Sequence, residues 1–262
     1  HFVGRPDFPF VQLYPSGSPG HYARILDRDG YRVLARGVDP KKDQSYFLWR
    51  LGQEELSRTI FPLGGVTKEE IKRYVEGKGF HEKVEKKESM EVCFIPGDYR
   101  DFLREQLPDL AQQVGGGYFV DSTGRKLGQH KGFPFYTIGQ RKGLEIALGK
   151  PMFVTRINPI KNTIRLGDRD ELLTRRMVIT DVLEATPGIL ESAGPVDVQI
   201  RYRSSAIPAT LQKGDTPGEW LVCFESDASA VTPGQSAVIY SDNTVIGGGI
   251  IADQRLLKKY KE

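Results

Sequence analysis

Two thiols are the first candidates for nucleophilic chemistry in this chain, Cys93 and Cys223. A thiol reacts as its thiolate, which nearby positive charges stabilise. The lysines that precede Cys93 in KVEKKESMEVCF alternate with glutamates, so the local sequence supplies no net positive charge. Free cysteines are mostly buried and unreactive, so composition alone favours that role for Cys93 and leaves a catalytic role open. Cys223, in the apolar stretch WLVCF, is predicted to lie in the core.

The other residue types that could do chemistry form no site that their spacing reveals. His1, His21, His81 and His130 are scattered, so the sequence predicts no metal site and favours surface or hydrogen-bonding histidines. The sequence shows no recognisable order of Ser, His and Asp that would indicate a catalytic triad, and it contains no G-x-x-x-x-G-K-[ST] phosphate-binding loop. The GGG at 247–249 follows a predicted strand but precedes no helix start, which indicates a close backbone contact or a bulge.

Two stretches combine basic and aromatic residues, GFPFYTIGQRKG (132–143) and IRYRSS (200–205). Arg and Lys neutralise phosphates and aromatic rings stack on exposed bases, so either stretch could bind nucleic acid. A solvated strand face has a similar composition, and composition alone does not separate the two interpretations.

The elements that must position these residues differ between the two ends of the chain. In the first part, Asp27–Gly30 should form the D-G turn of a β-hairpin. Short helices are expected over 51–58, over 67–77 with a T-x-x-E capping box, and over 98–107. Cys93 would then lie between the second and third of these helices.

After about residue 115 the pattern changes to short alternating runs between Gly, Asp and Asn turns, such as VDVQIRYR and EWLVCFES. Each run fits a strand of about five residues, and their spacing indicates small β-barrels or sandwiches. The sequence therefore predicts a multidomain α+β protein with an α-rich first part and an all-β remainder.

Length and composition limit the class of protein further. The chain has 262 residues, 39% of them hydrophobic, which is enough for one large or two to three small domains. A net charge of +3 permits a polyanionic partner without requiring one. No apolar run has the length of a membrane span and no signal peptide is visible. Two cysteines fit a reducing compartment, so we expect a cytoplasmic protein.

Eight strings occur in an order that resembles one known family. They are GHYARI (20–25), RGVDPKKDQSYFL (36–48), FPLG (61–64), KKESMEVCFI (86–95), YTIGQRKGL (136–144), RYR (201–203), AVTPGQSAVIY (230–240) and GGGII (247–251). This set is similar to the bacterial tRNA-specific 2-thiouridylases, which use ATP to replace the C2 oxygen of the wobble uridine with sulfur. The resemblance covers about residues 20–256.

The resemblance implies roles for particular residues. Cys93 matches the family cysteine that accepts sulfur as a persulfide and delivers it to the base, although Glu88, Met90 and Glu91 depart from the common K-K-D-S-T-G-I-C-F-I string. Gly20 matches a glycine of the nucleotide site. The residues that match the family's tRNA contacts are His21, Lys42, Asp43, Gln44, Arg201, Tyr202 and Gln235.

The resemblance also implies a domain order. Residues 1–19 would be an irregular arm, and 20–110 the remnant of an α/β PP-loop domain of the adenine nucleotide alpha hydrolase type. Residues 111–172 would form a small β-rich central domain, and 173–262 a C-terminal β-barrel that grips tRNA.

The family uses ATP, with Mg, as a co-substrate and has no tightly bound cofactor. The resemblance implies two partners, the anticodon arm of tRNA and a sulfur-donor protein such as a cysteine desulfurase or a sulfur relay protein. It implies no association with a membrane. The family's S-G-G-x-D-S and N-P-x-x-x-C strings do not occur in this sequence, so we expect no thiolation by this polypeptide alone. Cys223 does not match the family's other cysteine. The alternative prediction is a non-catalytic tRNA- or RNA-binding fragment with the same fold.

Overall fold

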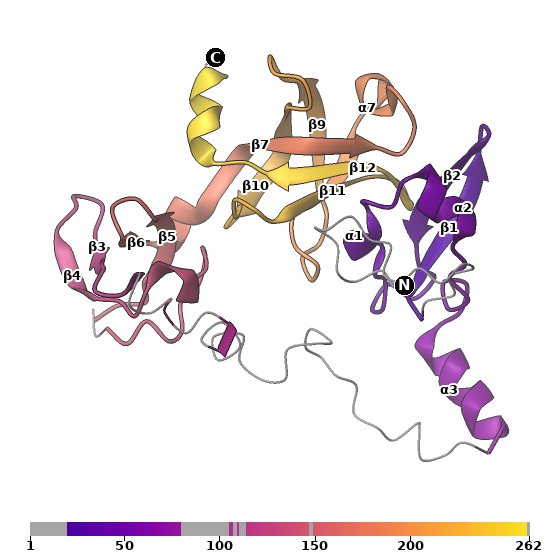
Figure 1. The fold of residues 1–262 in the computed structure, drawn as a ribbon, viewed down its shortest axis with the longest axis horizontal. Helices are drawn as coiled ribbons and strands as arrows, with labels where there is room; N and C mark the ends of the chain where they lie inside the picture. Colours follow the sequence, from indigo (N-terminus) through magenta and orange to yellow (C-terminus); the bar gives the residue numbers. More distant parts are fainter. Residues whose placement is uncertain (1–19, 80–104, 107–108, 110–113, 147–148, 261–262) are drawn as a thin grey trace. The chain divides into compact units, whose positions relative to one another are not determined.

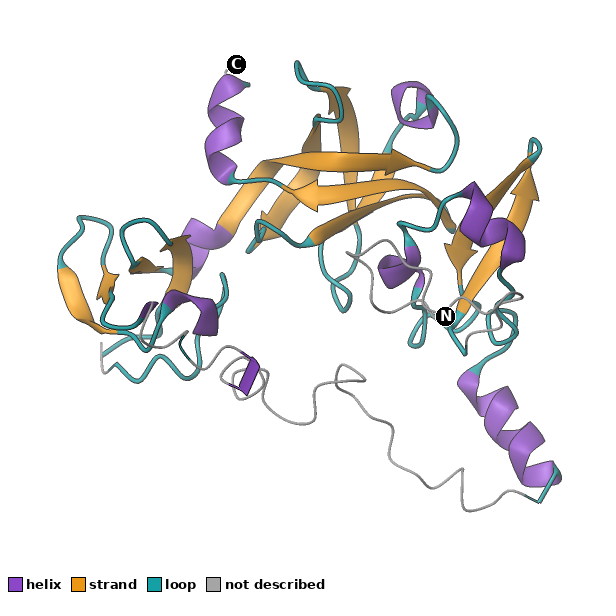
Figure 2. Cartoon of the chain, in the orientation of Figure 1, coloured by secondary structure: helices purple, strands orange, loops and turns teal. Residues whose placement is uncertain are grey.

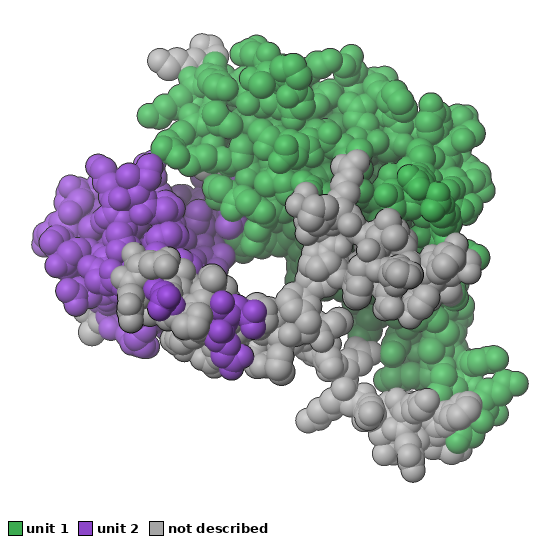
Figure 3. Space-filling view, in the orientation of Figure 1, with its two compact units in different colours: residues 1–85, 175–226, 233–262 green, residues 86–174, 227–232 purple. Residues whose placement is uncertain are grey.

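The computed structural model describes residues 20–79, 105–106, 109, 114–146 and 149–260 (Figure 1). Two compact units divide the chain (Figure 3). The first comprises residues 1–85, 175–226 and 233–262, and the second comprises residues 86–174 and 227–232.

A β-hairpin opens the described part of the first unit. β1 (Ala23–Arg28) pairs antiparallel with β2 (Tyr31–Arg36). Asp29 and Gly30, at φ 51° and 80°, connect them. Two successive positive φ angles are typical of the type I′ turn that D-G sequences favour, so the predicted hairpin is confirmed.

Three short helices follow the hairpin, α1 (Ser45–Leu48), α2 (Gln53–Arg58) and α3 (Lys68–Gly77). The Thr67 hydroxyl accepts a hydrogen bond from the Glu70 amide, and the Glu70 carboxylate accepts one from the Thr67 amide at 2.6 Å. This reciprocal capping box begins α3 as predicted. Most of the helix predicted over 98–107 lies outside the described residues.

Six strands close a barrel in the first unit (Figures 1 and 2). Around the ring the order is β7–β12–β11–β8–β9–β10, and the pairing of β12 with β7 closes it. The strands are β7 (Leu173–Glu184), β8 (Val196–Gln199), β9 (Ile207–Lys213), β10 (Trp220–Ser229), β11 (Ser236–Ser241) and β12 (Thr244–Ile251). The short helix α7 (Ile189–Ser192) follows β7, and the 3₁₀ helix η3 (Gln254–Lys259) follows β12.

The hairpin extends the sheet of the barrel, because β2 pairs with β12 at Ala35 and Thr244. One core lies beneath this junction. It combines Tyr46, Leu48 and Trp49 from α1 and its C-cap with Val238 and Tyr240 from β11. Residues 20–79 and the barrel thus share buried side chains within one unit.

The three glycines at 247–249 allow close packing around β12. A Cβ on Gly248 would lie 2.6 Å from the Trp49 ring, and a Cβ on Gly249 would lie 2.9 Å from the Thr180 carbonyl oxygen. The β12–β7 register also shifts between Gly248 and Ile250. The prediction of a close backbone contact or a bulge at this GGG is confirmed.

The second unit has a four-stranded sheet of order β4–β3–β6–β5, in which β3 and β6 run parallel. Its elements are β3 (Tyr118–Val120), β4 (Lys126–Gln129), η1 (Phe133–Phe135), β5 (Phe153–Asn158), β6 (Thr163–Gly167) and η2 (Arg169–Leu172). The core includes Phe119, Phe135, Tyr136, Val154 and Ile164. Together the two units form a multidomain α+β protein, as predicted. The predicted domain boundaries stay predictions.

Candidate nucleic-acid interface

Asp43 organises the loop between β2 and α1. Its Oδ1 accepts hydrogen bonds from the amides of Gly37 at 3.0 Å and Ser45 at 3.1 Å. Its Oδ2 accepts from the Ser45 hydroxyl at 2.9 Å and from Arg36 Nη1 at 3.2 Å. Only 8% of the Asp43 side chain is exposed. Since four donors already use the carboxylate, Asp43 fixes the loop that presents its neighbours Lys42 and Gln44.

Gln44 ties this loop to the beginning of the described chain. Its side-chain oxygen accepts from the Tyr22 amide at 3.1 Å, and its own amide donates to the Tyr22 carbonyl at 2.9 Å. The neighbouring His21 is half-buried against Phe61, with ring centroids 6.2 Å apart, and burial lowers the pKa of its imidazole. Gly20 is exposed. The predicted residues Gly20, His21 and Gln44 therefore lie close together.

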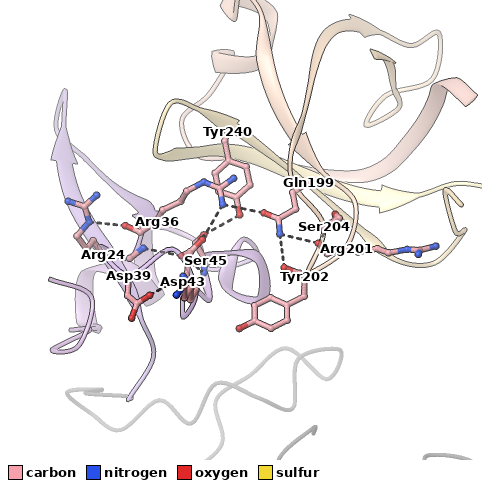
Figure 4. A network of polar contacts seen from close by, with 12 residues as sticks. Arg24, Arg36, Asp39, Asp43, Ser45, Gln199, Arg201, Tyr202, Ser204 and Tyr240 are labelled. Carbon is pink, nitrogen blue, oxygen red and sulfur yellow. Dashed lines mark hydrogen bonds and ion pairs between the residues drawn. The ribbon is translucent and has the colours of Figure 1, made fainter. Parts of the chain in front are cut away.

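Arg36 connects the loop to the barrel (Figure 4). The same Nη1 that donates to Asp43 lies 3.3 Å from Gln199 Oε1, and the guanidinium carbon lies 3.6 Å from the centroid of the Tyr240 ring. Gln199 Nε2 donates in turn to the carbonyls of Arg201 at 3.0 Å and Tyr202 at 2.8 Å. The structure thus brings the predicted Lys42–Gln44 string and the Arg201–Tyr202 pair to one place.

Two tyrosines make further links between α1 and β11. The Tyr46 hydroxyl donates to the Ser236 carbonyl at 2.9 Å, and Ser236 directly follows the predicted site residue Gln235. The Tyr240 hydroxyl lies 3.1 Å from Ser45 Oγ. Burial raises the pKa of both tyrosines to about 12, so both phenols are protonated donors at neutral pH. Gln235 is half-buried, with its side-chain oxygen buried and without a hydrogen-bond partner among the described residues.

An aromatic pair, exposed Phe47 and half-buried Tyr202, lies beside this network. The rings of Phe47 and Tyr202 are 4.3 Å apart and tilted by 40°, and Phe47 is 45% exposed. Burial and the Asp43 carboxylate raise the pKa of Tyr202, while the positive charges of Arg203 and Lys42 oppose that rise. Aromatic rings flanked by cations suit unpaired nucleotides, because bases stack on the rings and the cations neutralise phosphates.

Sequence reasoning did not assign four contributors to this site, Arg36, Phe47, Gln199 and Tyr240. Arg36 and Phe47 lie within the string RGVDPKKDQSYFL, next to the residues that were assigned. Gln199 lies two residues before Arg201, and Tyr240 five residues after Gln235. Proximity to the family strings was the available signal, but only the fold shows that these side chains meet.

The other predicted clusters and residues have different outcomes. In GFPFYTIGQRKG the rings of Phe135 and Tyr136 are buried in the core of the second unit, so they are not available to stack on bases. His130 is a buried, hydrogen-bonded histidine: Nδ1 accepts from the Gly132 amide at 3.1 Å, and Nε2 lies 3.3 Å from the Asn162 carbonyl. Cys223 lies in β10 as expected but is half-buried, not enclosed in the core.

Cys93 lies outside the described residues. Among the residues that are described, no three His, Cys, Asp or Glu side chains are grouped so as to hold a metal ion. None of the helices in the described ranges has the length and apolar character needed to cross a membrane.

Comparison with known sequence families finds three consecutive matches. Residues 16–97 match a tRNA methyl transferase HUP domain, residues 100–168 a tRNA methyl transferase PRC-barrel domain, and residues 171–251 an aminomethyltransferase beta-barrel domain. The three matches follow one another along nearly the whole chain.

Curated relatives match over a similar length. The chain is 55% identical over 236 residues to "tRNA-specific 2-thiouridylase MnmA 3" of Bacteroides fragilis, covering 90% of the chain and 65% of the relative. It is 53% identical over 242 residues to the protein of the same name from Phocaeicola vulgatus, covering 92% and 64%. It is 46% identical over 238 residues to "tRNA-specific 2-thiouridylase MnmA" of Chlorobium luteolum, covering 88% and 64%. The chain thus spans a little under two thirds of each of these relatives.

Proposed function

Because the chain belongs to the family of tRNA-specific 2-thiouridylases, we propose that the whole protein replaces the C2 oxygen of the wobble uridine of tRNA with sulfur. In this proposal it is a transferase that consumes ATP and acts in the cytoplasm, where its tRNA substrate occurs. The observation that supports the tRNA-binding half of the proposal is the junction of the Lys42–Gln44 loop with the Arg201–Tyr202 turn, where the exposed ring of Phe47 lies against Tyr202.

The roles at this junction follow from side-chain chemistry. Lys42 and Arg201 would neutralise phosphates of the anticodon arm, and Tyr202 would stack on an unpaired base. Asp43 would act by holding the loop, because its carboxylate is already fully hydrogen-bonded. Gln44, His21 and Gln235 present amide and imidazole groups that suit base edges and ribose hydroxyls.

The sulfur-transfer half of the proposal centres on Cys93. A sulfur-donor protein would load Cys93 as a persulfide. ATP would adenylate the C2 oxygen of the uridine, which makes AMP a good leaving group. The terminal persulfide sulfur then attacks C2 and AMP departs, and a second thiol must cleave the remaining S–S bond to leave C2=S. Cys223, half-buried in β10, is not proposed as that thiol.

Gly20 is the only described residue assigned to the nucleotide site. Among the described residues, only Leu63 Cδ1, at 4.0 Å, would approach a Cβ placed on Gly20. We propose that residues 20–110 belong to the PP-loop domain of the whole enzyme. Since this polypeptide contains no S-G-G-x-D-S string, we propose that it does not activate the uridine by itself.

Mass spectrometry after incubation with a cysteine desulfurase and free cysteine tests the sulfur-carrier role. We expect one added sulfur atom on Cys93, removable by reducing agent and absent in Cys93→Ala. Cys223→Ala is the matched control and should retain the added sulfur. Sulfur on neither cysteine, or on Cys223 alone, would instead favour the alternative of a non-catalytic RNA-binding protein.

A second experiment tests the reaction. The whole protein is incubated with ATP, a persulfide source and unmodified tRNA, and the nucleosides are analysed by mass. The proposal requires the mass gain of exchanging oxygen for sulfur in the wobble uridine. A gain equal to one methyl group, or modification at another position, would overturn it.

A further inference from the structure

Gln199, at the end of β8, is buried, and its amide group is fully used. The amide oxygen accepts from Arg36 at 3.3 Å, and the amide nitrogen donates to the consecutive carbonyls of Arg201 and Tyr202. Because the oxygen can only accept and the nitrogen can only donate, these partners fix which way the amide faces. Gln199 therefore holds the backbone of the turn that carries the Arg201 and Tyr202 side chains.

Arg36, the hydrogen-bond partner of the Gln199 amide oxygen, is also held by several contacts. Its guanidinium lies over the face of Tyr240 and donates to both Asp43 and Gln199. Its main-chain amide donates to the Asn243 carbonyl at 2.8 Å, and its carbonyl accepts from Arg24 Nε at 2.8 Å. A planar guanidinium can stack and donate to two partners at once, whereas a lysine ammonium at the end of a flexible chain cannot reproduce that arrangement.

We propose that Arg36 and Gln199 are positioning residues that set the distance and the orientation between the Lys42–Gln44 loop and the Arg201–Tyr202 turn. This inference rests on the proposed function, in which both segments bind one tRNA. Neither positioning residue has to touch the tRNA. Their linked side chains determine how many phosphates the two segments contact at the same time.

The salt dependence of tRNA binding separates this role from a merely structural one. Each neutralised phosphate adds a little less than one to the slope of log affinity against log salt concentration. A variant that is only less stable, but is measured while folded, keeps the slope of the wild type. A variant whose two segments no longer match the phosphate spacing loses part of the slope.

The main variants of the test and their controls leave the net charge unchanged. Gln199→Met keeps the side-chain length but removes all three hydrogen bonds. Arg36→Lys keeps the charge but removes the planar guanidinium that stacks on Tyr240 while it donates to Asp43 and Gln199. The matched controls are Gln212→Met, at an exposed position of β9, and Arg28→Lys, at the exposed end of β1. Binding of a fluorescently labelled tRNA is measured by anisotropy over a series of salt concentrations, at a temperature where circular dichroism shows every variant folded.

Gln199→Met and Arg36→Lys should each reduce the salt slope by about one and weaken binding at low salt about tenfold, while the controls keep the wild-type values. The double variant should be little worse than either single one, because both changes break the same connection. If folded Gln199→Met and Arg36→Lys both keep the wild-type salt slope, this inference is wrong and the proposed function is unaffected. If the wild-type chain shows no salt-dependent tRNA binding, the proposed function fails and the inference fails with it.

Gln199→Glu identifies which of the three bonds matters. The carboxylate retains an acceptor for Arg36 but faces the two carbonyls with a second acceptor, so the turn should lose its support. We expect the slope of Gln199→Glu to fall as in Gln199→Met. A wild-type slope would show that the Arg36 contact suffices and would overturn the role assigned to the two carbonyl bonds.

Discussion

Ser45 and Tyr240 lie 195 residues apart in the sequence, yet their hydroxyl oxygens are 3.1 Å apart in the buried interior. Ser45 Oγ donates its one hydrogen to Asp43 Oδ2, so the Tyr240 hydroxyl must be the donor to Ser45. A relay of hydrogen bonds therefore leads from barrel strand β11 to the loop that carries Lys42 and Gln44, and it ends on the same Asp43 oxygen to which Arg36 donates.

Removing the Tyr240 hydroxyl should destabilise the first unit modestly. Tyr240→Phe keeps the ring under Arg36 but loses the hydrogen bond to Ser45, at a cost of about 1 kcal/mol in the free energy of unfolding. Both tryptophans of the chain, Trp49 and Trp220, are buried in this unit, so urea unfolding followed by tryptophan fluorescence reports on it directly. Exposed Tyr31→Phe is the control and should change little. Equal stability of Tyr240→Phe and wild type would contradict the relay.

Removing the exposed aromatic ring of Phe47 should weaken tRNA binding. A base stacked on an aromatic side chain contributes about 1–3 kcal/mol, so Phe47→Ala should raise the dissociation constant at least fivefold with an unchanged salt slope. Anisotropy with labelled tRNA measures both quantities. Tyr74→Ala, on exposed α3, is the control. A similar loss in the control would mean that neither ring marks a specific site.

Adding one methyl group at Gly64 should strongly destabilise the hairpin junction. A Cβ there would lie 1.7 Å from the Ala23 carbonyl oxygen, so Gly64→Ala must displace β1 at a cost of about 3 kcal/mol or more. Around the adjacent Gly65, no atom of a non-neighbouring described residue lies within 4 Å of the Cβ position, which makes Gly65→Ala a close control. Thermal unfolding of the two variants is compared, and similar melting temperatures would disprove the close approach.

The stability of the second unit should depend on the charge of His130. Burial lowers the pKa of His130 below its ordinary value of 6.5, so the unfolded chain takes up a proton at a higher pH than the folded one. The contribution of neutral, buried His130 to the free energy of unfolding is fully present above pH 6.5. It is lost as the pH falls from there toward the pKa of His130 in the folded protein.

Comparison with His130→Gln isolates this contribution, because the variant keeps the other histidines. Between about pH 7.5 and about pH 5.5 the melting temperature should fall more for the wild type than for the variant. An imidazole NMR titration of His130 should give a midpoint below 6.5. Parallel pH profiles for the two proteins would contradict the prediction.

Local chemistry made several elements predictable. The Asp29–Gly30 turn and the Thr67–Glu70 capping box depend on residues at most three positions apart, so their physical causes are visible in the sequence. The same holds for the GGG at 247–249, whose lack of side chains indicates close packing without revealing the partner. One of the partners, the Trp49 ring, belongs to the C-cap of α1 far away in the sequence and is known only from the fold.

Several residues of the candidate site were predictable from the sequence, but their burial was not. Lys42, Asp43 and Gln44 were recognisable from a resemblance, but the sequence could not show that Asp43 is buried among four donors. It also could not distinguish Phe135 and Tyr136, which are buried in a core, from Tyr202, which is half-buried beside exposed Phe47. Burial depends on the tertiary packing around a ring, and short stretches of similar composition do not encode it.

The pairing of Ala35 with Thr244 has a consequence for synthesis on the ribosome. β2 emerges from the exit tunnel long before β12 exists, and at roughly 5–20 residues per second about 200 further residues take some tens of seconds. During that interval the hairpin has a free β2 edge where β12 will later bind. Contacts between such distant segments also form slowly after release. A chaperone that shields nascent strands should therefore increase the yield of folded protein more than it would for a helical protein of equal length.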